Sequence, residues 1–330
     1  MRTGKVKSSV YDRSIMRQLH SVMADQPVDA RGAAKVSYPE DGKPGLISKV
    51  FTVEGKTMTA LRTVTRALSQ IAAARAITPV NVSLMVLLPK DVEEPWLKGF
   101  MRELADLCQK SEVLRIADAD ARVSLAVQDV VVSVSLTGRA KLPDLKKGQA
   151  KADDKEYDLI VAGEVAAEGT ALLTSQYKKQ LLSRYPNDFL TVAEGLLAES
   201  GQTIRALGPC MEGARYGYPL GEGGVFAGFW DLAAAIKVGL DVSLKKIPIR
   251  QHTIEVCEFF KLNPYMLIST GSFLIVAKNG AEIVLKLREM GIAAEVVGRT
   301  NAGNDRIIRY DDEVRYLEPP KADEYIKVQE

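Results

Sequence analysis

The sequence predicts a mixed α/β (α+β) fold in two domains, and three observations lead to that prediction. A chain of 330 residues has room for about two domains of ordinary size. Segments with strand and helix periodicity alternate through residues 46–138, as they do in α/β and α+β domains. The alternation resumes after a charged, turn-rich segment at residues 141–156, which we interpret as an exposed hairpin tip or a linker.

These observations divide the chain into three parts. Residues 1–45 are polar and broken by Gly and Pro, so we expect an arm or irregular lead-in. Residues 46–155 form the first α/β domain, and residues 156–330 form the second.

The first domain opens with a short strand at residues 46–53. A helix follows at 58–76, because apolar residues recur there at helical spacing and alanine is frequent. Residues 80–88 form a β-branched run between two prolines, which predicts a buried strand. An amphipathic helix at 91–113 and two strands within 114–138 complete the domain.

The second domain repeats the mixed pattern. The expected elements are, in order, a strand at 157–165, helices at 168–185, 187–200 and 225–240, a strand at 241–250, a helix at 252–262, a strand, turn and strand at 266–278, a helix at 279–291, and two strands about a turn at 292–310.

Charge and composition exclude several classes of function. Forty-four basic and 42 acidic residues leave a net charge of +2, which gives no electrostatic footprint for nucleic acid or an anionic membrane. There is neither a signal peptide nor an unbroken apolar run of about 18 residues, so we expect a cytoplasmic protein without a membrane span. The three cysteines, Cys108, Cys210 and Cys257, form no CxxC pair and are expected to be small core residues.

Two short motifs carry possible chemistry. The GEGG sequence at 221–224 precedes a predicted helix, and a glycine turn before a helix start can bind phosphate or can be an ordinary tight turn. Asp118 and Asp120 stand two residues apart at the end of a predicted strand, so they share a face. Such a pair can hold Mg²⁺ or can be solvated. The STGS turn at 269–272 is expected to close a hairpin, and with two histidines no catalytic base can be assigned.

A longer pattern makes a family recognisable. Its parts are GEGGVFAGFWDLA, then KKIPIRQHTIEVCEFFKLNPYMLISTGSFLIVAKNG, then VVGRTNAGNDRIIRYDDEVRYLEPPKADEYIKV. In this order they resemble the C-terminal domain of the aminoimidazole ribonucleotide (AIR) synthase-related, or PurM-like, family. That family includes hydrogenase maturation proteins that dehydrate a carbamoyl group. The EGT sequence at 168–170 also fits, and the likeness extends more faintly over most of residues 46–328.

The resemblance implies a two-domain AIR synthase-like fold and a homodimer in which the N-terminal sheet pairs with its twofold mate. It also implies ATP and Mg²⁺ between the domains, used to phosphorylate an amide or carbamoyl oxygen. The positions that match the family's cofactor-binding motifs are Asp120, Glu168, Gly169, Thr170, Glu222, Gly223, Gly224, Ser269 and Gly271, with Asp120 also the expected metal ligand.

The sequence departs from the family where acids are expected. Ser69–Gln70 replaces an Asn-Asp pair, Arg75–Ala76 replaces Gly-Ala, Lys49 stands near the place of a first-strand aspartate, and Tyr218–Pro219 replaces His-Asp. One interpretation is a lost ATP site, which we favour. The other is that Lys49 and Arg75 offset the phosphate charge without metal.

The chain also ends in IKVQE, without the cysteine that accepts the carbamoyl group in the dehydrating members, so that reaction is not expected. The sequence therefore predicts an AIR synthase-related, hydrogenase expression/formation-like protein with an impaired ATP site. The alternative is a non-catalytic dimer of the same fold that binds a metabolite or a protein partner. The substrate cannot be deduced.

Overall fold

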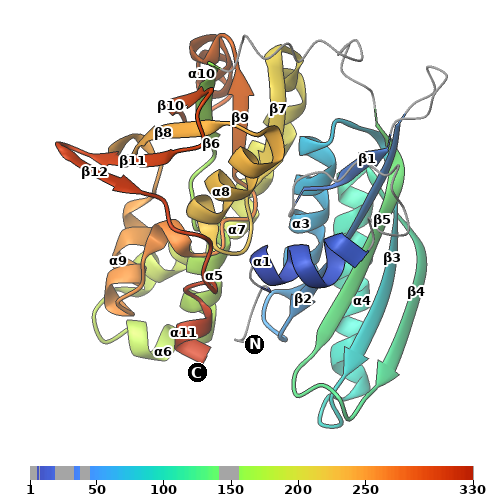
Figure 1. The fold of residues 1–330 in the computed structure, drawn as a ribbon. Coiled ribbons are helices and arrows are strands. Elements are labelled where there is room, and N and C mark those ends of the chain that lie inside the picture. The colour runs from blue at the N-terminus through green and yellow to red at the C-terminus, as the bar shows by residue number, and fades with distance from the viewer. Residues whose placement is uncertain (1–5, 7, 19–32, 38–44, 141–155, 330) are drawn as a thin grey trace. The chain divides into compact units, whose positions relative to one another are not determined.

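Residues 6, 8–18, 33–37, 45–140 and 156–329 are described by the computed structural model, and they fall into two units (Figure 1). The N-terminal unit comprises Ala33–Asp144. The C-terminal unit comprises Leu145–Glu330 together with Met1–Gly32. The chain passes from one unit to the other inside the predicted linker, nearly all of which lies outside the described residues.

The N-terminal unit is a five-stranded sheet with two helices. Its strands are β1 (Lys35–Ser37), β2 (Gly45–Glu54), β3 (Ala76–Leu88), β4 (Leu114–Val123) and β5 (Val131–Ala140), in the order β1-β2-β5-β3-β4. Its helices are α3 (Thr59–Ala73) and α4 (Glu94–Ser111). All neighbouring strands are antiparallel except β3 and β4, and α4 provides the crossover that a parallel pair requires.

Both helices of this unit contribute to one hydrophobic core with the sheet. Val64 and Ile71 of α3 and Phe100 and Leu104 of α4 are buried in the same cluster as alternate residues of β3 and β5. The intervening residues point to the other face, where large apolar side chains are exposed on β2 and β3. These are Leu46, Val50, Ile77 and Met85, at 60, 64, 43 and 37% exposure.

The C-terminal unit is built on a seven-stranded sheet in the order β12-β11-β8-β10-β6-β9-β7. The strands are β6 (Asp158–Ala162), β7 (Ala214–Pro219), β8 (Gly239–Ser243), β9 (Phe273–Ala277), β10 (Ala294–Asn301), β11 (Arg306–Tyr310) and β12 (Glu313–Tyr316). Its larger helices are α5 (Ala167–Gln176), α7 (Asn187–Cys210), α8 (Gly224–Ile236), α9 (Gln251–Phe259) and α10 (Gly280–Glu289). Short helical segments are α1 (Ser8–Tyr11), η1 (Asp12–Met16), α6 (Lys178–Leu181), η2 (Met211–Gly213), η3 (Leu244–Lys246), η4 (Pro264–Met266) and α11 (Ile326–Gln329).

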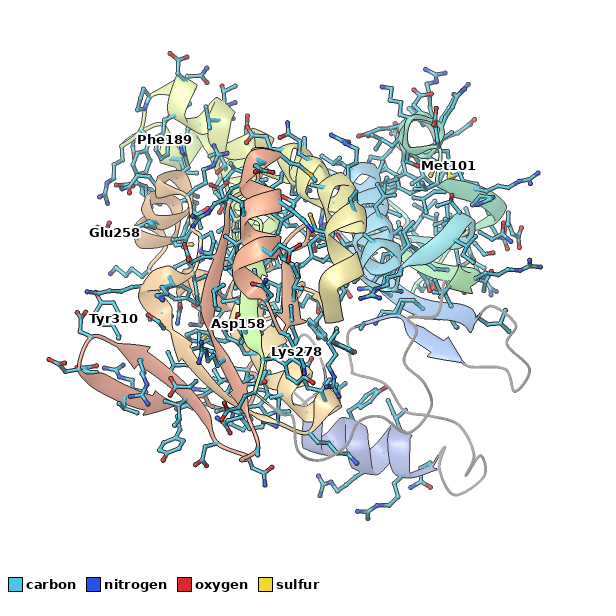
Figure 2. The ribbon with its side chains drawn as sticks, turned by 90° about the horizontal axis from the view of Figure 1, so that it is seen from above. Met101, Asp158, Phe189, Glu258, Lys278 and Tyr310 are labelled. Atoms are coloured by element: carbon cyan, nitrogen blue, oxygen red, sulfur yellow. The ribbon has the colours of Figure 1, made fainter. Side chains whose placement is uncertain are left out.

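The centre of this sheet is covered on both faces. All five residues of β9 are buried, as are four of the five in β6. That pattern is typical of strands packed between layers, and it explains why these segments read as continuous apolar runs. Asp158, at the start of β6, accepts a hydrogen bond from the N–H of Gly280, the first residue of α10, at 2.9 Å (Figure 2).

The mixed α/β class and most predicted elements are confirmed. The main differences arise where strands pair with partners that are distant in the sequence. Part of the expected lead-in is regular, since α1, η1 and β1 lie within it. The helix predicted at 168–185 breaks at Tyr177, and the helix predicted at 225–240 ends at Ile236 because residues 239–243 form β8. The short strands β7 and β12 were not predicted.

The hairpin expected at 266–278 is wrong, whereas the two strands expected about a turn at 292–310 are present as β10 and β11. Residues 266–268 do not form a strand, and their backbone bonds run to segments outside any sheet. The strands β10 and β11 do not pair with each other, because β8 lies between them, antiparallel to β10 and parallel to β11.

No helix of the described residues is long and apolar enough to cross a lipid bilayer.

Candidate functional site

The site residues predicted in the C-terminal unit meet around one loop, Asn263–Ser272, which we call the central loop. At the start of α5, the N–H of Gly169 donates to the carbonyl of Ile268 at 3.1 Å. Just before α8, the carbonyl of Gly221 accepts the N–H of Ser269, also at 3.1 Å. The structure therefore brings together the EGT, GEGG and STGS motifs, which are separated by up to 100 residues in the chain.

The glycine at the start of α8 is required by the close approach of the central loop. Gly224 has a φ of +63°, a left-handed conformation that side chains disfavour. A β-carbon there would stand 2.5 Å from the carbonyl oxygen of Tyr265 and 2.8 Å from that of Leu267. The space that glycine leaves at this turn is filled by the protein's own backbone.

The polar residues of these motifs are also engaged internally. Glu168, Thr170 and Ser269 are completely buried. The Thr170 hydroxyl lies 2.8 Å from the carbonyl oxygen of Ala166 and 3.0 Å from the Thr253 hydroxyl. The Ser269 hydroxyl accepts the N–H of Ala166 and donates to the carbonyl of Leu267, both at 2.8 Å. Ser269 thus fastens the start of α5 to the central loop, and Thr170 joins α5 to the start of α9.

A buried carboxylate completes the arrangement at the start of α8. One oxygen of Asp323 accepts the N–H of Gly223 at 2.6 Å, and the other accepts the N–H of Tyr325 at 2.9 Å. The N–H of Ile268, in the central loop, is directed toward this carboxylate and acts to lower its pKa. Burial raises the pKa of Asp323 to about 7, while these backbone bonds act to lower it.

Asp323 leaves little room for another anion at this helix start. Its carboxylate holds the N–H of Gly223, and the N–H of Gly224 donates to the carbonyl of Gly221 at 3.1 Å. A helix N-terminus binds anions through such free donors and through its positive dipole. Here the N–H groups of Gly223 and Gly224 are taken, and the Asp323 side chain already lies at the helix start.

Glu324, the next residue, holds the central loop from the other end. Its carboxylate accepts the N–H of Asn263 at 3.1 Å, and its own N–H donates to the carbonyl of Met266 at 3.3 Å. The sequence contained this Asp-Glu pair within the family pattern, but nothing local indicated which backbone groups it would hold.

Asp120 belongs to the other unit, on the edge strand β4. Its side chain is exposed and accepts the N–H of Ala121 at 2.8 Å. Asp118 is exposed on the same strand. Of the family departures, Lys49 donates from Nζ to the carbonyl of Ala33 at 3.2 Å, and the Tyr218 hydroxyl donates to Asp231 at 3.1 Å. Among the described residues, no three His, Cys, Asp or Glu side chains gather in a group that could hold a metal ion.

The cysteines are core residues, as predicted. Cys108, Cys210 and Cys257 are free and buried, and burial raises the pKa of each thiol, to about 11 for Cys108 and about 12 for Cys257. A thiol reacts as its thiolate, so these side chains are poor nucleophiles at neutral pH.

Comparison with known proteins confirms the resemblance seen in the sequence. The chain is 26% identical over 263 residues to a Methanocaldococcus jannaschii protein named as a hydrogenase expression/formation protein, covering 76% of this chain and 75% of that one. It is 22% identical over 226 residues to carbamoyl dehydratase HypE of Rhizobium leguminosarum, covering 62% and 61%. No family model matches.

Solved structures establish the fold. The chain superposes on HypE from a HypE–HypF complex with a TM-score of 0.69 and 16% identity, covering 93% of this chain and 99% of that chain. It superposes on AaThiL complexed with AMPPCP and TMP with a TM-score of 0.67 and 12% identity, covering 96% of this chain and 100% of that chain. It superposes on HypE in complex with ATP with a TM-score of 0.65 and 14% identity, covering 94% of this chain and 96% of that chain. The protein has the PurM-like two-domain fold. Its relatives in sequence include a hydrogenase expression/formation protein and a carbamoyl dehydratase HypE.

The packing at Gly224 can be tested by substitution. Gly224→Val should lower the free energy of unfolding by about 3 kcal/mol or more, because a left-handed conformation and a backbone clash are both imposed. Urea denaturation provides the measurement. Gly221→Ala is the matched control, since a β-carbon at Gly221 meets no atom within 4 Å. An unchanged midpoint for Gly224→Val would mean that the central loop does not contact this turn.

The raised pKa of Asp323 predicts a pH-dependent stability. Between its ordinary value of 3.8 and about 7 the folded protein binds more protons than the unfolded chain, so this residue's contribution weakens as pH rises. From pH 5 to pH 8 the loss should be on the order of 2 kcal/mol. Asp323→Asn should flatten this part of the profile in urea titrations. An identical slope in the variant would contradict the assignment.

Proposed function

We propose that this chain is a PurM-like protein in which ATP-dependent activation of an amide or carbamoyl oxygen is lost or strongly reduced. The observation that supports the proposal is the Asp323 carboxylate, which accepts the N–H of Gly223. In its absence, that N–H at the start of α8 could donate a hydrogen bond to a phosphate. A phosphate placed there would lose the Gly223 donor and, above about pH 7 where Asp323 is mainly ionised, would also be repelled by its negative charge.

Nucleotide binding is nevertheless the capacity that the fold suggests. One HypE structure among its neighbours is in complex with ATP, and the AaThiL structure contains AMPPCP. The residues of this chain fit such a group poorly in two respects. The GEGG turn is filled by Tyr265 and Leu267. Asp120, the carboxylate expected to hold Mg²⁺, is a solvent-exposed side chain of an edge strand. One or two carboxylates together with phosphate oxygens usually hold Mg²⁺.

Carbamoyl dehydration has no thiol acceptor among the residues of this chain. That reaction, as the family likeness implies it, needs an accessible cysteine, whereas Cys108, Cys210 and Cys257 are buried with raised pKa values. This supports the second function that we consider, a dimeric member of the fold that binds a metabolite or a protein partner. HypE itself was solved in a complex with HypF. A cytoplasmic location agrees with the reduced thiols and is part of the same proposal.

Mg-ATP calorimetry tests the first part of the proposal. We expect weak or undetectable heat and no ATP hydrolysis, because the N–H groups of Gly223 and Gly224 are occupied and one exposed carboxylate rarely holds the metal. Asp120→Asn should keep both the fold and this behaviour. Micromolar binding of Mg-ATP that disappears in Asp120→Asn would overturn the proposal and would support an ATP-dependent enzyme instead.

Light scattering tests the dimer. One face of the N-terminal sheet exposes the large apolar side chains Leu46, Val50, Ile77 and Met85 on β2 and β3, and exposed apolar side chains gathered on one sheet face are a feature of association sites. We expect a mass of twice the 36.0 kDa chain at micromolar concentration, and a shift towards monomer in Val50→Lys. The matched control is Leu285→Lys, which changes an exposed residue of α10 in the other unit. A stable monomer in the unmodified protein would exclude the dimer.

A further inference from the structure

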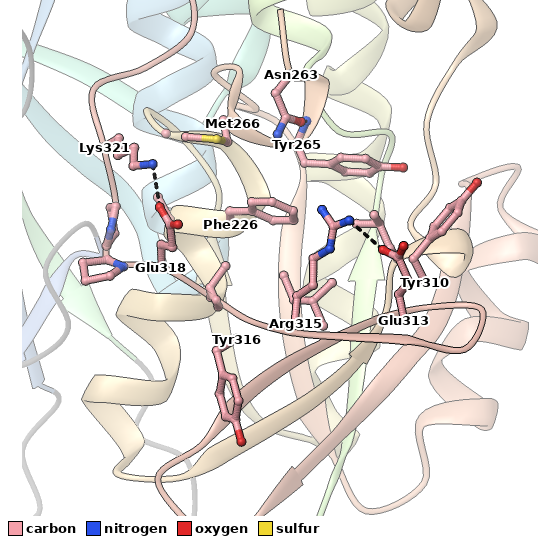
Figure 3. A pocket seen from close by; sticks show the side chains of 17 residues that line it. Phe226, Asn263, Tyr265, Met266, Tyr310, Glu313, Arg315, Tyr316, Glu318 and Lys321 are labelled. Atoms are coloured by element: carbon pink, nitrogen blue, oxygen red, sulfur yellow. Dashed lines mark hydrogen bonds and ion pairs between the residues drawn. The ribbon is translucent and has the colours of Figure 1, made fainter.

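The C-terminal unit contains a pocket that the sequence analysis did not predict as a binding site. It has a volume of about 470 Å³ and lies between the start of α8, the central loop, the β11–β12 hairpin and the segment Leu317–Lys321 that follows it (Figure 3). Pockets of this size accommodate drug-sized organic molecules. Of the sequence-predicted site residues, only Gly223 lines it.

Aromatic rings dominate one side of this pocket. Phe226 of α8 and Tyr265 of the central loop are stacked, with ring centroids 5.5 Å apart and ring planes 10° from parallel. Tyr310 and Tyr316 come from the hairpin, and Met266 adds a thioether (Figure 3). Flat aromatic surfaces favour stacking with another flat ring, and the contact is worth more than the area alone.

The charged side chains of the lining cancel in pairs. Arg315 contacts Glu313 at 2.6 Å, and Lys321 contacts Glu318 at 2.5 Å (Figure 3). Lys245, which lies over the ring of Tyr310, is paired in turn with Asp311 at 2.5 Å. An anionic or cationic ligand would therefore meet a balanced field and would gain little, whereas a neutral one leaves all three pairs intact.

Neutral polar groups remain to orient a ligand. Burial raises the pKa of Tyr265, so its phenol is uncharged at neutral pH and can donate a hydrogen bond. The side-chain oxygen of Asn263 accepts the N–H of Tyr265 at 3.0 Å, which fixes the amide at the pocket. The walls are held in place as well, because Asp323 and Glu324 fasten the central loop to α8.

We propose that this pocket binds an uncharged, planar aromatic or heteroaromatic small molecule, stacked against the Phe226–Tyr265 pair. The inference goes beyond the proposed function and stands whether or not the chain binds ATP, because every lining residue lies in the C-terminal unit.

Ligand-observed saturation-transfer NMR on the full chain tests this proposal with four probes. Adenosine and indole are neutral and planar, and AMP and indole-3-acetate are their anionic counterparts. We expect saturation transfer to both neutral probes at millimolar concentration and at least fivefold weaker affinity for the anionic ones. Transfer to none of the probes, or tighter binding of the anionic pair, would overturn the proposal.

Three variants locate the binding. Phe226→Leu should weaken it about fivefold or more by removing the stacked ring. Ala227→Met should abolish it by filling the pocket from a buried lining position, while circular dichroism shows the fold retained. Trp96→Leu is the control, because Trp96 is a half-buried ring stacked on Phe100 in the other unit. Unchanged binding in both pocket variants, or loss in the control alone, would contradict the site. Calorimetry with Mg-ATP on Ala227→Met measures ATP binding, which the proposed function concerns. The NMR experiment measures binding of the neutral aromatic probes, so the two proposals can fail independently.

Discussion

The buried carboxylate of Asp323 is the interaction on which the central part of the C-terminal unit depends. It accepts backbone N–H groups from the α8 turn and from its own segment, at Gly223 and Tyr325. The Gly223 N–H would otherwise be buried without this partner, at a cost of about 1–3 kcal/mol. A single side chain therefore joins two segments that are 100 residues apart in sequence.

The family motifs gain a physical meaning from this network. Gly224 is glycine because the carbonyls of Tyr265 and Leu267 occupy the space of a β-carbon. Ser269 serves both as an acceptor for the start of α5 and as a donor within its own loop. A motif that resembles a phosphate-binding turn can thus be required for internal packing alone, since both uses need the backbone to approach closely.

Periodicity predicted the elements whose partners are their immediate surroundings. Helices α3 and α4 and strands β2, β3 and β5 were all expected, because their apolar spacing is set by one core. The prediction failed where pairing partners are distant. Insertion of β8 between β10 and β11 cannot be inferred from the turn at 301–305, and residues 266–268 are apolar without being a strand.

The candidate site, like the fold, could be predicted only in part from the sequence. The sequence indicated that the GEGG, EGT and STGS motifs belong together, because the family order links them. It gave no indication that Asp323 accepts the N–H of Gly223, since a capping carboxylate 100 residues away leaves no local pattern. The aromatic pocket was missed for a similar reason: its lining comes from short segments whose side chains, taken singly, resemble ordinary surface and core residues.

The closed helix start and the open pocket have one cause. By holding Gly223 and Tyr325, Asp323 draws the segment before it alongside α8, where the carbonyl of Lys321 lies 4.0 Å from the β-carbon position of Gly223. Residues 317–321, whose first residue is also held to β11 by the bond from the Leu317 N–H to the carbonyl of Arg306, form a wall of the pocket. The carboxylate that accepts the N–H of Gly223 thus lies next to the segment that lines the aromatic pocket. This arrangement is the common basis of our two proposals, a weakened phosphate site and a site for an uncharged ring.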